Sequence, residues 1–304
     1  MDKEVDTFQH NTPLSSIPYR IIARYRILLP PESMPELPEV ETVRAGLTPH
    51  ITGRTVTDVT IRDPRLRWPI DPALPAHLTG LTVRSVSRRA KYLLIDFGQE
   101  CRLIMHLGMS GSIRMVETGL APEKHDHLDL VFGASTLRFR DPRRFGAVLW
   151  HIGPPELHPL LARLGPEPLS EEFDGARLYA ATRSKRAAIK TVLMDNHVVV
   201  GVGNIYANEA LFAARIDPRR AANSLDADAC ARLVAEVREV LTRAIAAGGS
   251  TLRDFTDAIG KPGYFQQTYA VYGRDGWPCP VCGGPVASVR IGQRSSFYCP
   301  HCQC

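Results

Sequence analysis

The chain has 304 residues, 44% of them hydrophobic, and a formal net charge of +5 at pH 7. This length and apolar content are typical of a globular protein with two ordinary domains and a buried core. No run of about 18 apolar residues occurs, and Arg24 and Arg26 interrupt the early apolar stretch, so the sequence indicates neither a transmembrane helix nor a signal peptide and a cytoplasmic protein is expected.

Residues 1–33 form a leader without a recognisable motif, polar at first and closed by two prolines. The next stretch, MPELPEVETV at residues 34–43, looks like the beginning of a protein although it lies inside the chain. Apolar residues from Leu37 onward recur at helical spacing, and proline and glutamates occupy the first turns, where a helix favours them. A short amphipathic helix is therefore predicted directly after Pro35.

The segment from residue 55 to residue 141 is rich in strand-forming residues. Many of its runs alternate between apolar and polar positions and are separated by Gly, Pro and Asp. Such a succession of strands predicts a β-sandwich or a barrel. The runs are TVTDVTI, LTVRSVS, KYLLIDF, RLIMHL, HLDLVF and TLRFRD.

The pattern becomes helical after RLGPEPLS at residues 163–170, which predicts an all-α domain up to about residue 250. We expect its longest helix to be capped by Ser224 and to stop at Gly248. A Gly-rich stretch, DAIGKPGYFQQTY, then leads into the tail and could form a mobile loop.

A glycine turn lies between two helices of this domain. Gly201 and Gly203 permit a tight turn, and Asn204 is placed to cap the helix that follows. The first amides of such a helix can seat a phosphate, although most helix-turn-helix elements only contribute packing. The turn alone is therefore a weak indication of a phosphate site.

Basic residues gather in three clusters, and no acidic residue lies between Asp174 and Asp195. Such clusters can line one groove for a nucleic acid, while the alternative is three solvated faces. The clusters are Arg84, Arg88, Arg89 and Lys91; Arg138, Arg140, Arg143 and Arg144; and Arg183, Lys185, Arg186 and Lys190.

Four of the seven cysteines form two CxxC pairs in the tail, Cys279 with Cys282 and Cys299 with Cys302. Pairs at this spacing predict a tetrahedral four-thiolate site for one structural Zn²⁺, with disulfides as the alternative. Four thiolates leave no open coordination position, so the metal would stabilise the fold without taking part in chemistry. Cys304 could replace Cys302, although the repeated CPxC pattern favours Cys302.

The residues between the cysteine pairs predict a β-hairpin with Gly292, Gln293 and Arg294 near its tip. A hairpin fixed by a metal can hold one arginine rigidly toward a phosphate.

With these pieces assembled, the chain resembles the bacterial formamidopyrimidine-DNA glycosylase family, which excises oxidised purines such as 8-oxoguanine and nicks the strand. The resemblance covers nearly everything from Met34 to Gln303. It rests on PELPEVET, RRAKYLL, HLGMSGS, KHDHLDL, DPRRFG, LGPEPLS, LMDN, GVGNIYANEALF, GKPGYF, CPVCGGP and RSSFYCPHCQ.

The resemblance implies an α+β multidomain fold that binds lesion-containing double-stranded DNA as a monomer, in the cleft between its domains. After the leader at 1–33, we expect an N-terminal catalytic β-sandwich domain with flanking helices at 34–165. An all-α helix-two-turn-helix domain follows at 166–260. A flexible loop and a C-terminal zinc-finger β-hairpin complete the chain at 261–304.

Excising a base and then cutting the strand through an imine requires an amine that attacks C1′ of the sugar. The nitrogen of an internal proline is an amide, whereas at a free terminus it is a secondary amine. The resemblance therefore implies that translation starts at Met34 and that removal of this residue exposes Pro35. It also implies Glu36 as a general acid/base in sugar ring opening, Lys91 as proton donor in the first elimination, and Arg294 as the residue of the second elimination.

Further residues carry over from the family as contacts to DNA. Met109, Arg143 and Phe145 match three side chains that fill the void left by the everted base, whereas from their residue types alone Met109 and Phe145 belong in a core. The backbone-phosphate contacts are expected to be His125, Arg186 and Asn204.

Some side chains have plainer interpretations. From the residues alone, Glu36 is equally a helix-terminal carboxylate, and Lys91 is a phosphate contact. The sequence HDH at 125–127 could suggest a metal site, but two histidines at this spacing lack a third ligand. We expect His106 to be structural.

Two other functions stay open at this point. An endonuclease VIII type of glycosylase would use the same chemistry on oxidised pyrimidines, although the PELPEVET opening and the void-filling set favour purines. A non-catalytic zinc-ribbon protein would use the same basic grooves for DNA binding alone. The combination of Pro35, Glu36 and Lys91 argues against this alternative.

Overall fold

The computed structural model describes residues 35–248 and 269–304. The predicted leader and most of the predicted mobile loop lie outside these ranges. Within them, every helix is too short or too polar to cross a membrane.

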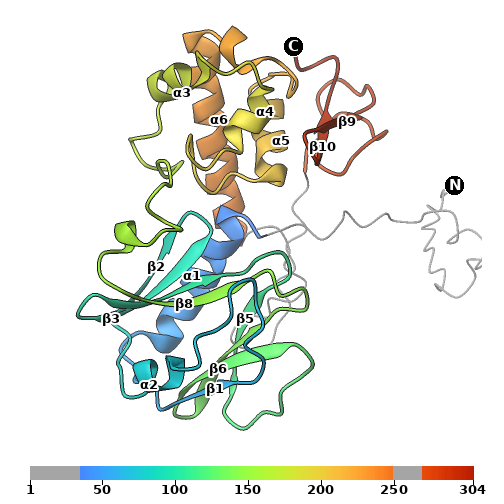
Figure 1. Cartoon of the computed structure of the whole chain (residues 1–304). Coiled ribbons are helices and arrows are strands. Elements are labelled where there is room, and N and C mark those ends of the chain that lie inside the picture. The colour runs from blue at the N-terminus through green and yellow to red at the C-terminus, as the bar shows by residue number, and fades with distance from the viewer. Residues whose placement is uncertain (1–34, 249–268) are drawn as a thin grey trace, which may run out of the picture. The chain divides into compact units, whose positions relative to one another are not determined.

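Two four-stranded antiparallel sheets form the first part of the described chain (Figure 1). One sheet has the strand order β1-β6-β7-β5 and the other β2-β3-β4-β8. The strands are β1 (Asp58–Ile61), β2 (Ser85–Arg89), β3 (Tyr92–Gly98), β4 (Cys101–His106), β5 (Ser112–Glu117), β6 (Asp126–Phe132), β7 (Ser135–Arg140) and β8 (Ala147–Ile152). The predicted sandwich is confirmed, and β5 and β8 are strands that the sequence patterns did not single out.

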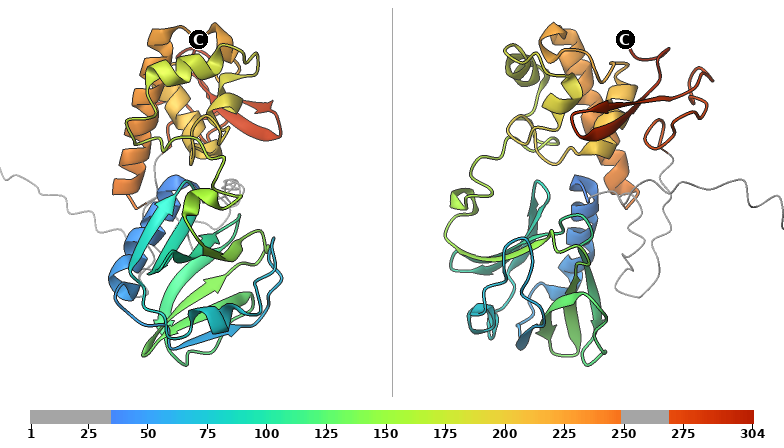
Figure 2. Two further views of the ribbon diagram at one scale, coloured as in Figure 1. Left: turned by 60° about the vertical axis from the view of Figure 1, so that its left-hand side comes forward. Right: turned by 45° about the vertical axis from the view of Figure 1, so that its right-hand side comes forward.

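The two sheets lie face to face (Figure 2). One hydrophobic core fills the space between them. Side chains from both sheets meet there, including Leu103 of β4 and Phe139 of β7, each 0% exposed. Helix α1 (Leu37–Ile51) adds Val43 and Leu47 to this core. The short helix α2 (Leu74–Leu78) adds its two terminal leucines. The predicted helix after Pro35 is therefore confirmed, and its apolar face is what attaches it to the sandwich.

A second core belongs to four helices, of which α6 is the longest (Figure 1). The helices are α3 (Gly175–Thr182), α4 (Ile189–Leu193), α5 (Asn204–Ala213) and α6 (Ala227–Ala246), preceded by the 3₁₀ turns η2 (Pro155–Leu157) and, before α6, η3 (Ala222–Ser224). Both α3 and α5 contact α6. The predicted all-α segment is confirmed.

Helix α6 begins later than its sequence suggested. Ser224 lies in η3, where its hydroxyl donates to the carbonyl of Ala221 at 2.8 Å. The cap is Asp226, whose carboxylate accepts from the amide of Ala229 at 2.7 Å. The expectation that Ser224 caps this helix is therefore wrong, whereas the predicted stop at Gly248 agrees with that residue's φ of +81°.

The tail forms a two-stranded antiparallel hairpin of β9 (Ala287–Ile291) and β10 (Arg294–Tyr298). Gly292, with φ of +60°, stands at its turn, which confirms the predicted hairpin. A small core attaches this unit to α5, since Phe212 packs with Val271 and Val286.

The assignment of the α6 cap leads to a stability prediction. Asp226→Ala removes the carboxylate that accepts from Ala229, so the free energy of unfolding should fall by about 1 kcal/mol. Ser224→Ala leaves the cap intact and should change it by less than about 0.5 kcal/mol. Urea denaturation followed by circular dichroism measures both. A larger loss in the Ser224 variant would contradict this assignment.

Candidate active site

The carboxylate of Glu36 binds the N-terminus of helix α5. Its oxygens accept hydrogen bonds from the amides of Gly203 at 2.8 Å, Ile205 at 2.8 Å and Tyr206 at 3.4 Å. Asn204 was expected to cap this helix, but the helix begins at Asn204 and has Gly203 as its N-cap residue. Glu36 thus occupies the amides of Ile205 and Tyr206, two of the first helical amides that the sequence weakly indicated as a phosphate site.

The glycine turn before α5 makes this approach possible. A Cβ on Gly203 would lie 2.2 Å from Cδ of Glu36, and one on Gly201 would lie 2.7 Å from Cβ of Leu37. The amide of Leu37 donates to the carbonyl of Gly201 at 3.2 Å. The two glycines are therefore required because the side chains of Glu36 and Leu37 occupy the space that a Cβ atom would take at these positions.

Burial places the ionisation of Glu36 near neutral pH. The residue is 3% exposed. Its burial raises the pKa of Glu36 from 4.5 to about 7, although the positive charge of Lys91 and the amides of α5 act in the opposite direction. A carboxyl group with this pKa can both give and take a proton at physiological pH.

Glu39 supports Glu36 from one helical turn away. Its carboxylate accepts from the amide of Glu36 at 2.8 Å and from the hydroxyl of Tyr206 at 2.6 Å. The negative charge of Glu39 also contributes to the raised pKa of Glu36. Glu39 thus joins the start of α1 to α5 by a second contact, a role that its position in the sequence did not reveal.

The structure brings Lys91 into the electrostatic environment of both Glu36 and Arg294. Lys91 is half-buried, and burial lowers its pKa, while the charge of Glu36 raises it and that of Arg294 lowers it. Pro35 is buried and adjoins Glu36. Pro35 and Lys91 therefore lie close to the buried carboxyl group of Glu36, and Lys91 also interacts with Arg294.

Lys190 is a buried amine that we did not select from the sequence, although it belongs to the third basic cluster. It is 1% exposed, and its Nζ donates to Oδ1 of Asn204 at 2.6 Å, to Oγ of Ser296 at 2.6 Å and to the carbonyl of Ser295 at 3.1 Å. Burial lowers the pKa of Lys190 to about 7. The contacts tie α4 and α5 to β10, the strand that carries Arg294.

Glu209 is a second carboxylate that sequence patterns missed. It is 9% exposed and accepts from the amides of Ala270 at 2.8 Å, Val271 at 3.0 Å and Tyr272 at 2.8 Å. These bonds anchor the tail segment to α5. Only its place in GVGNIYANEALF hinted at a role, since the partners lie about sixty residues away along the chain.

The expected void-filling residues do not lie in a core. Phe145 is 45% exposed, and the guanidinium of Arg143 lies 5.2 Å from the centre of its ring. Met109 is half-buried. The core interpretation of Phe145 is therefore wrong, and exposed apolar side chains beside an arginine are what insertion into a base stack requires.

The histidines at 125 and 127 have separate environments. Both ring nitrogens of His127 lie against carbonyl oxygens, those of Asp63 at 3.2 Å and Asp141 at 2.8 Å, which rules out a metal-binding role. His125 is half-buried, with φ of +73°. In His106, Nδ1 accepts from the amide of Gly108 at 2.9 Å and burial lowers the pKa to about 4, in agreement with a structural role as a neutral ring.

Six of the twelve side chains in the predicted basic clusters form ion pairs with carboxylates of the described residues. Arg88 and Arg89 bind Glu167 at 2.7 and 2.8 Å. Arg138, 2% exposed, binds Asp129 at 2.8 Å. The continuous basic groove that three clusters suggested is therefore reduced to a few side chains.

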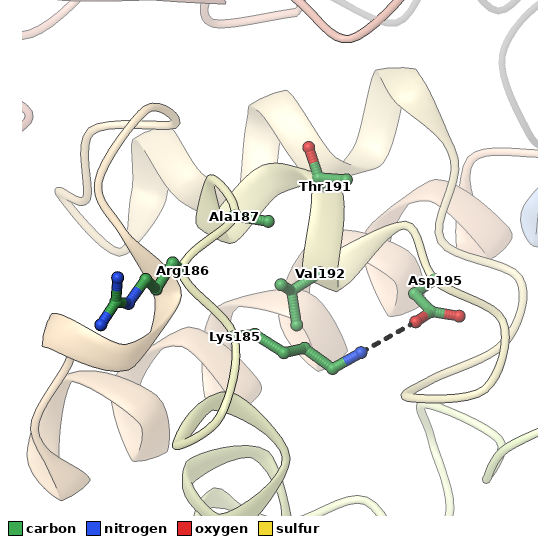
Figure 3. Close-up of a pocket in the computed structure, with 6 residues that line it drawn as sticks. All are labelled: Lys185, Arg186, Ala187, Thr191, Val192 and Asp195. Carbon is green, nitrogen blue, oxygen red and sulfur yellow. Dashed lines mark hydrogen bonds and ion pairs between the residues drawn. The ribbon is translucent and has the colours of Figure 1, made fainter.

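Arg143 and Arg186 are exposed and form no ion pair with any residue of the described ranges. Figure 3 shows Arg186 at an open pocket of about 410 Å³, pointing away from the ion pair of Lys185 and Asp195, whose atoms are 3.2 Å apart. Both arginines were expected to contact DNA, and their charges remain available for a phosphate or a base.

The four predicted zinc ligands converge on one point. Their sulfur atoms lie within 4.8 Å of one another, with 3.9 Å between Cys279 and Cys302 and 3.5 Å between Cys282 and Cys299. Tetrahedral Zn²⁺ with bonds of about 2.3 Å separates its sulfurs by about 3.8 Å, whereas a disulfide needs about 2 Å. The thiolates fit one structural zinc ion, and Cys304 lies outside the cluster.

Comparisons with known proteins agree with this arrangement. The formamidopyrimidine-DNA glycosylase N-terminal domain matches residues 34–148, the H2TH domain of the same family matches residues 164–256, and a zinc finger found in FPG and IleRS matches residues 276–303.

Individual relatives match over nearly all of their own length. A formamidopyrimidine-DNA glycosylase of Laribacter hongkongensis is 67% identical over 271 residues, which are 89% of this chain and 100% of the relative. A complex of Lactococcus lactis Fpg with DNA containing an abasic site has a TM-score of 0.82 at 35% identity, covering 88% of this chain and 99% of that one. The MutM (Fpg) protein of Thermus thermophilus has a TM-score of 0.78 at 43% identity, covering 88% and 98%.

A β-sandwich, an H2TH unit and a four-cysteine zinc finger in this order define the architecture of one class of DNA glycosylases. The chain belongs to the formamidopyrimidine-DNA glycosylase family.

Zinc content separates the two candidates for the fourth ligand. Cys302→Ser should reduce bound zinc well below one ion per chain and destabilise the hairpin, because a structural site needs all four thiolates. Cys304→Ser should keep one ion per chain. Atomic absorption on purified protein gives the stoichiometry, and zinc loss from the Cys304 variant alone would overturn the assignment.

Proposed function

We propose that this chain is a bifunctional DNA glycosylase and AP lyase of base excision repair that removes oxidised purines, formamidopyrimidines and 8-oxoguanine, from double-stranded DNA. Membership of the family supports the class of reaction. The observation that carries the proposal is the buried carboxyl group of Glu36, which adjoins Pro35, interacts with the charge of Lys91 and has a pKa of about 7.

The nucleophile is the secondary amine of Pro35, once whatever precedes it has been removed. At pH 7 roughly a tenth of a generic terminal amine is unprotonated, against less than about one part in a thousand of an ordinary lysine. The family match begins at residue 34, and the Laribacter relative aligns over its whole length with 271 residues of this chain, which supports a start at Met34.

In the first step the nitrogen of Pro35 bonds to C1′, and the base departs with the electron pair of the glycosidic bond and takes up the proton that the amine loses. The lone pair of the nitrogen then forms the C1′–N double bond and expels the ring oxygen, which opens the sugar ring. Glu36, protonated, donates to the ring oxygen as it leaves C1′. The iminium ion that results withdraws electrons from the sugar, which permits β-elimination of the 3′ phosphate and then δ-elimination of the 5′ phosphate. Lys91 acts in the first elimination and Arg294 in the second.

The DNA contacts follow from the same resemblance. Met109, Arg143 and Phe145 fill the space vacated by the flipped nucleotide. The phosphate backbone is bound by His125, Arg186 and Asn204, of which Asn204 also donates from Nδ2 to the carbonyl of Ser295 at 3.1 Å. Exposure of Arg143, Phe145 and Arg186 supports these roles.

We also propose the division into a leader at 1–33, a catalytic sandwich at 34–165, a helical domain at 166–260 and a loop with zinc finger at 261–304. Separate hydrophobic cores in the sandwich and the helices support it. One lesion requires one active site, so the enzyme acts as a monomer. Its substrate places it with the nucleoid in the cytoplasm.

Retention of the leader should abolish covalent chemistry, because Pro35 would then carry an amide. Protein that begins at Pro35 should form a borohydride-trapped adduct with a duplex containing 8-oxoguanine opposite cytosine, and protein verified by mass spectrometry to keep residues 1–33 should not. Equal trapping by both forms would contradict the proposed nucleophile. Absence of an adduct with either form would favour a protein that only binds DNA.

Glu36→Gln tests the acid role through the pH dependence of excision. A group with a pKa of about 7 is protonated below that pH, so the wild-type rate should decline as pH rises past about 7. The glutamine variant should be about 10²- to 10⁴-fold slower, and its residual rate should only increase with pH as the amine loses its proton. Single-turnover excision between pH 5.5 and 9 measures this, and an unchanged alkaline decline in the variant would disprove the assignment.

Substrate preference decides between the purine and pyrimidine branches. Release from 8-oxoguanine opposite cytosine should exceed release from thymine glycol opposite adenine by at least about tenfold in kcat/KM, a difference of about 1.4 kcal/mol in transition-state free energy. A clear preference for thymine glycol would instead identify an endonuclease VIII type of enzyme.

A further inference from the structure

Asp141 lies where loops of the β-sandwich meet, and the reaction described above assigns it no part. Its side chain is 0% exposed. Oδ1 accepts a hydrogen bond from the hydroxyl of Ser110 at 2.6 Å, and Oδ2 accepts one from the amide of Gly146 at 2.7 Å. One carboxylate therefore joins the loop after β4 to the loop after β7.

Ser110 extends this connection to the backbone of Arg143. Its Oγ accepts from the amide of Arg143 at 3.0 Å while donating to Asp141. Ser110 directly follows Met109, and Gly146 directly follows Phe145. Each of the three side chains assigned to void filling therefore belongs to, or adjoins, a residue in this hydrogen-bonded group.

The two loops are also in direct backbone contact. A Cβ on Gly108 would lie 2.4 Å from the carbonyl carbon of Phe145 and 2.5 Å from the amide nitrogen of Gly146. A Cβ on Gly146 would lie 2.8 Å from the carbonyl oxygen of His106. Neither position has room for a side chain, so the relative placement of the loops is fixed by close packing as well as by Asp141.

The backbone of Asp141 reaches a third segment. Its amide donates to the carbonyl of His125 at 3.1 Å, and its own carbonyl lies 2.8 Å from Nε2 of His127. His125 is the expected phosphate contact of this segment. The position of Asp141 thus relates the void-filling side chains to a contact on the DNA backbone.

We propose that Asp141 is a positioning residue that holds Met109, Arg143 and Phe145 in a single spatial arrangement, so that they enter the base stack together as the lesion is everted. This inference rests on the proposed function. Its physical basis is hydrogen bonding: the buried carboxylate has a donor for each oxygen. Among the described residues, the other side-chain acceptor that the two loops share is Oγ of Ser110, which itself donates to Asp141.

The effect should be specific to substrates in which a base must leave the stack. Void filling stabilises a duplex with one nucleotide everted, and a misplacement of about 1 Å in positioned groups can cost on the order of 10²-fold in rate. A single-stranded abasic site needs the amine and the eliminations but has no stack to fill. The two substrates therefore separate positioning of these loops from the chemistry.

Asp141→Ala should lower kcat/KM for 8-oxoguanine opposite cytosine in duplex DNA by roughly 10- to 100-fold and leave cleavage of a single-stranded abasic oligonucleotide within about twofold of wild type. Fluorescence of 2-aminopurine placed beside the lesion should report reduced unstacking by this variant. Asp141→Asn should recover to within about threefold of wild type, because its amide can accept from Gly146 and donate to Ser110.

Ser110→Ala keeps the carboxylate but removes its bridge to Arg143. It should lower kcat/KM on the duplex substrate by about threefold to tenfold and, like Asp141→Ala, leave cleavage of the single-stranded abasic site nearly unchanged. If the Asp141→Ala variant does not fold, Ser110→Ala serves as the test of the inference in its place. Thr136→Ala is the matched control, since it removes a buried hydroxyl on β7 that is bonded to Thr118 at 2.9 Å, away from the two loops, and should not discriminate between substrates.

Four results would overturn the inference: unchanged duplex excision by Asp141→Ala and by Ser110→Ala, equal losses on both substrates, unaltered 2-aminopurine fluorescence in a slow variant, or an Asp141→Asn variant as defective as the alanine. Wild-type protein beginning at Pro35 that is inactive on both substrates would instead refute the proposed function itself.

Discussion

The contact between the Glu36 carboxylate and the first amides of α5 is the interaction on which the site depends. Three amides and the positive charge of Lys91 favour the ionised form, while burial favours the neutral one. Burial prevails: a pKa raised from 4.5 to about 7 corresponds to roughly 3 kcal/mol in favour of the protonated acid. The carboxyl group beside Pro35 is thereby able to donate a proton at neutral pH, and the two glycines of the turn are needed because no side chain fits where α1 meets it.

Helix α5 is the common support of the residues grouped around that carboxylate. Its N-terminus receives Glu36, its Tyr206 hydroxyl binds Glu39, and its Glu209 accepts three amides of the tail. Lys190 connects the helix to β10, and the zinc cluster fixes the hairpin to which Arg294 belongs. Residues distant in sequence are held together by buried polar groups, each of which has its partners, as low-dielectric surroundings demand.

Charge is used in two different ways in this protein. Arginines such as Arg88 and Arg138 form ion pairs inside the fold, where an unpaired guanidinium would be costly. Arg143 and Arg186 instead face solvent without a carboxylate from any described residue, so their charges are available to a polyanion. A modest net charge is therefore compatible with DNA binding, because cations such as Arg143 and Arg186 have no carboxylate partner among the described residues and occupy exposed positions.

Local patterns in the sequence determined the helix after Pro35, the strands with clear alternation, the helical segment and the zinc ligands. Each of these follows from periodicity or from the fixed spacing of ligands along the chain. The same patterns failed where a side chain could serve two roles. Ser224 and Asp226 are both good caps, and only the 3₁₀ turn η3 takes Ser224 out of competition. Phe145 is an aromatic residue of a type that is usually buried in a core, and only the short loop after β7 exposes it.

The motifs also led to Pro35, Glu36, Lys91 and Arg294 through the family resemblance, but their spacing along the chain carries no information on pKa. Tertiary structure alone decided that Glu36 would be buried against α5, that half of the clustered basic side chains would be paired with carboxylates, and that Asp141 would join two loops. Burial and hydrogen bonding between distant segments exist only once the chain has folded.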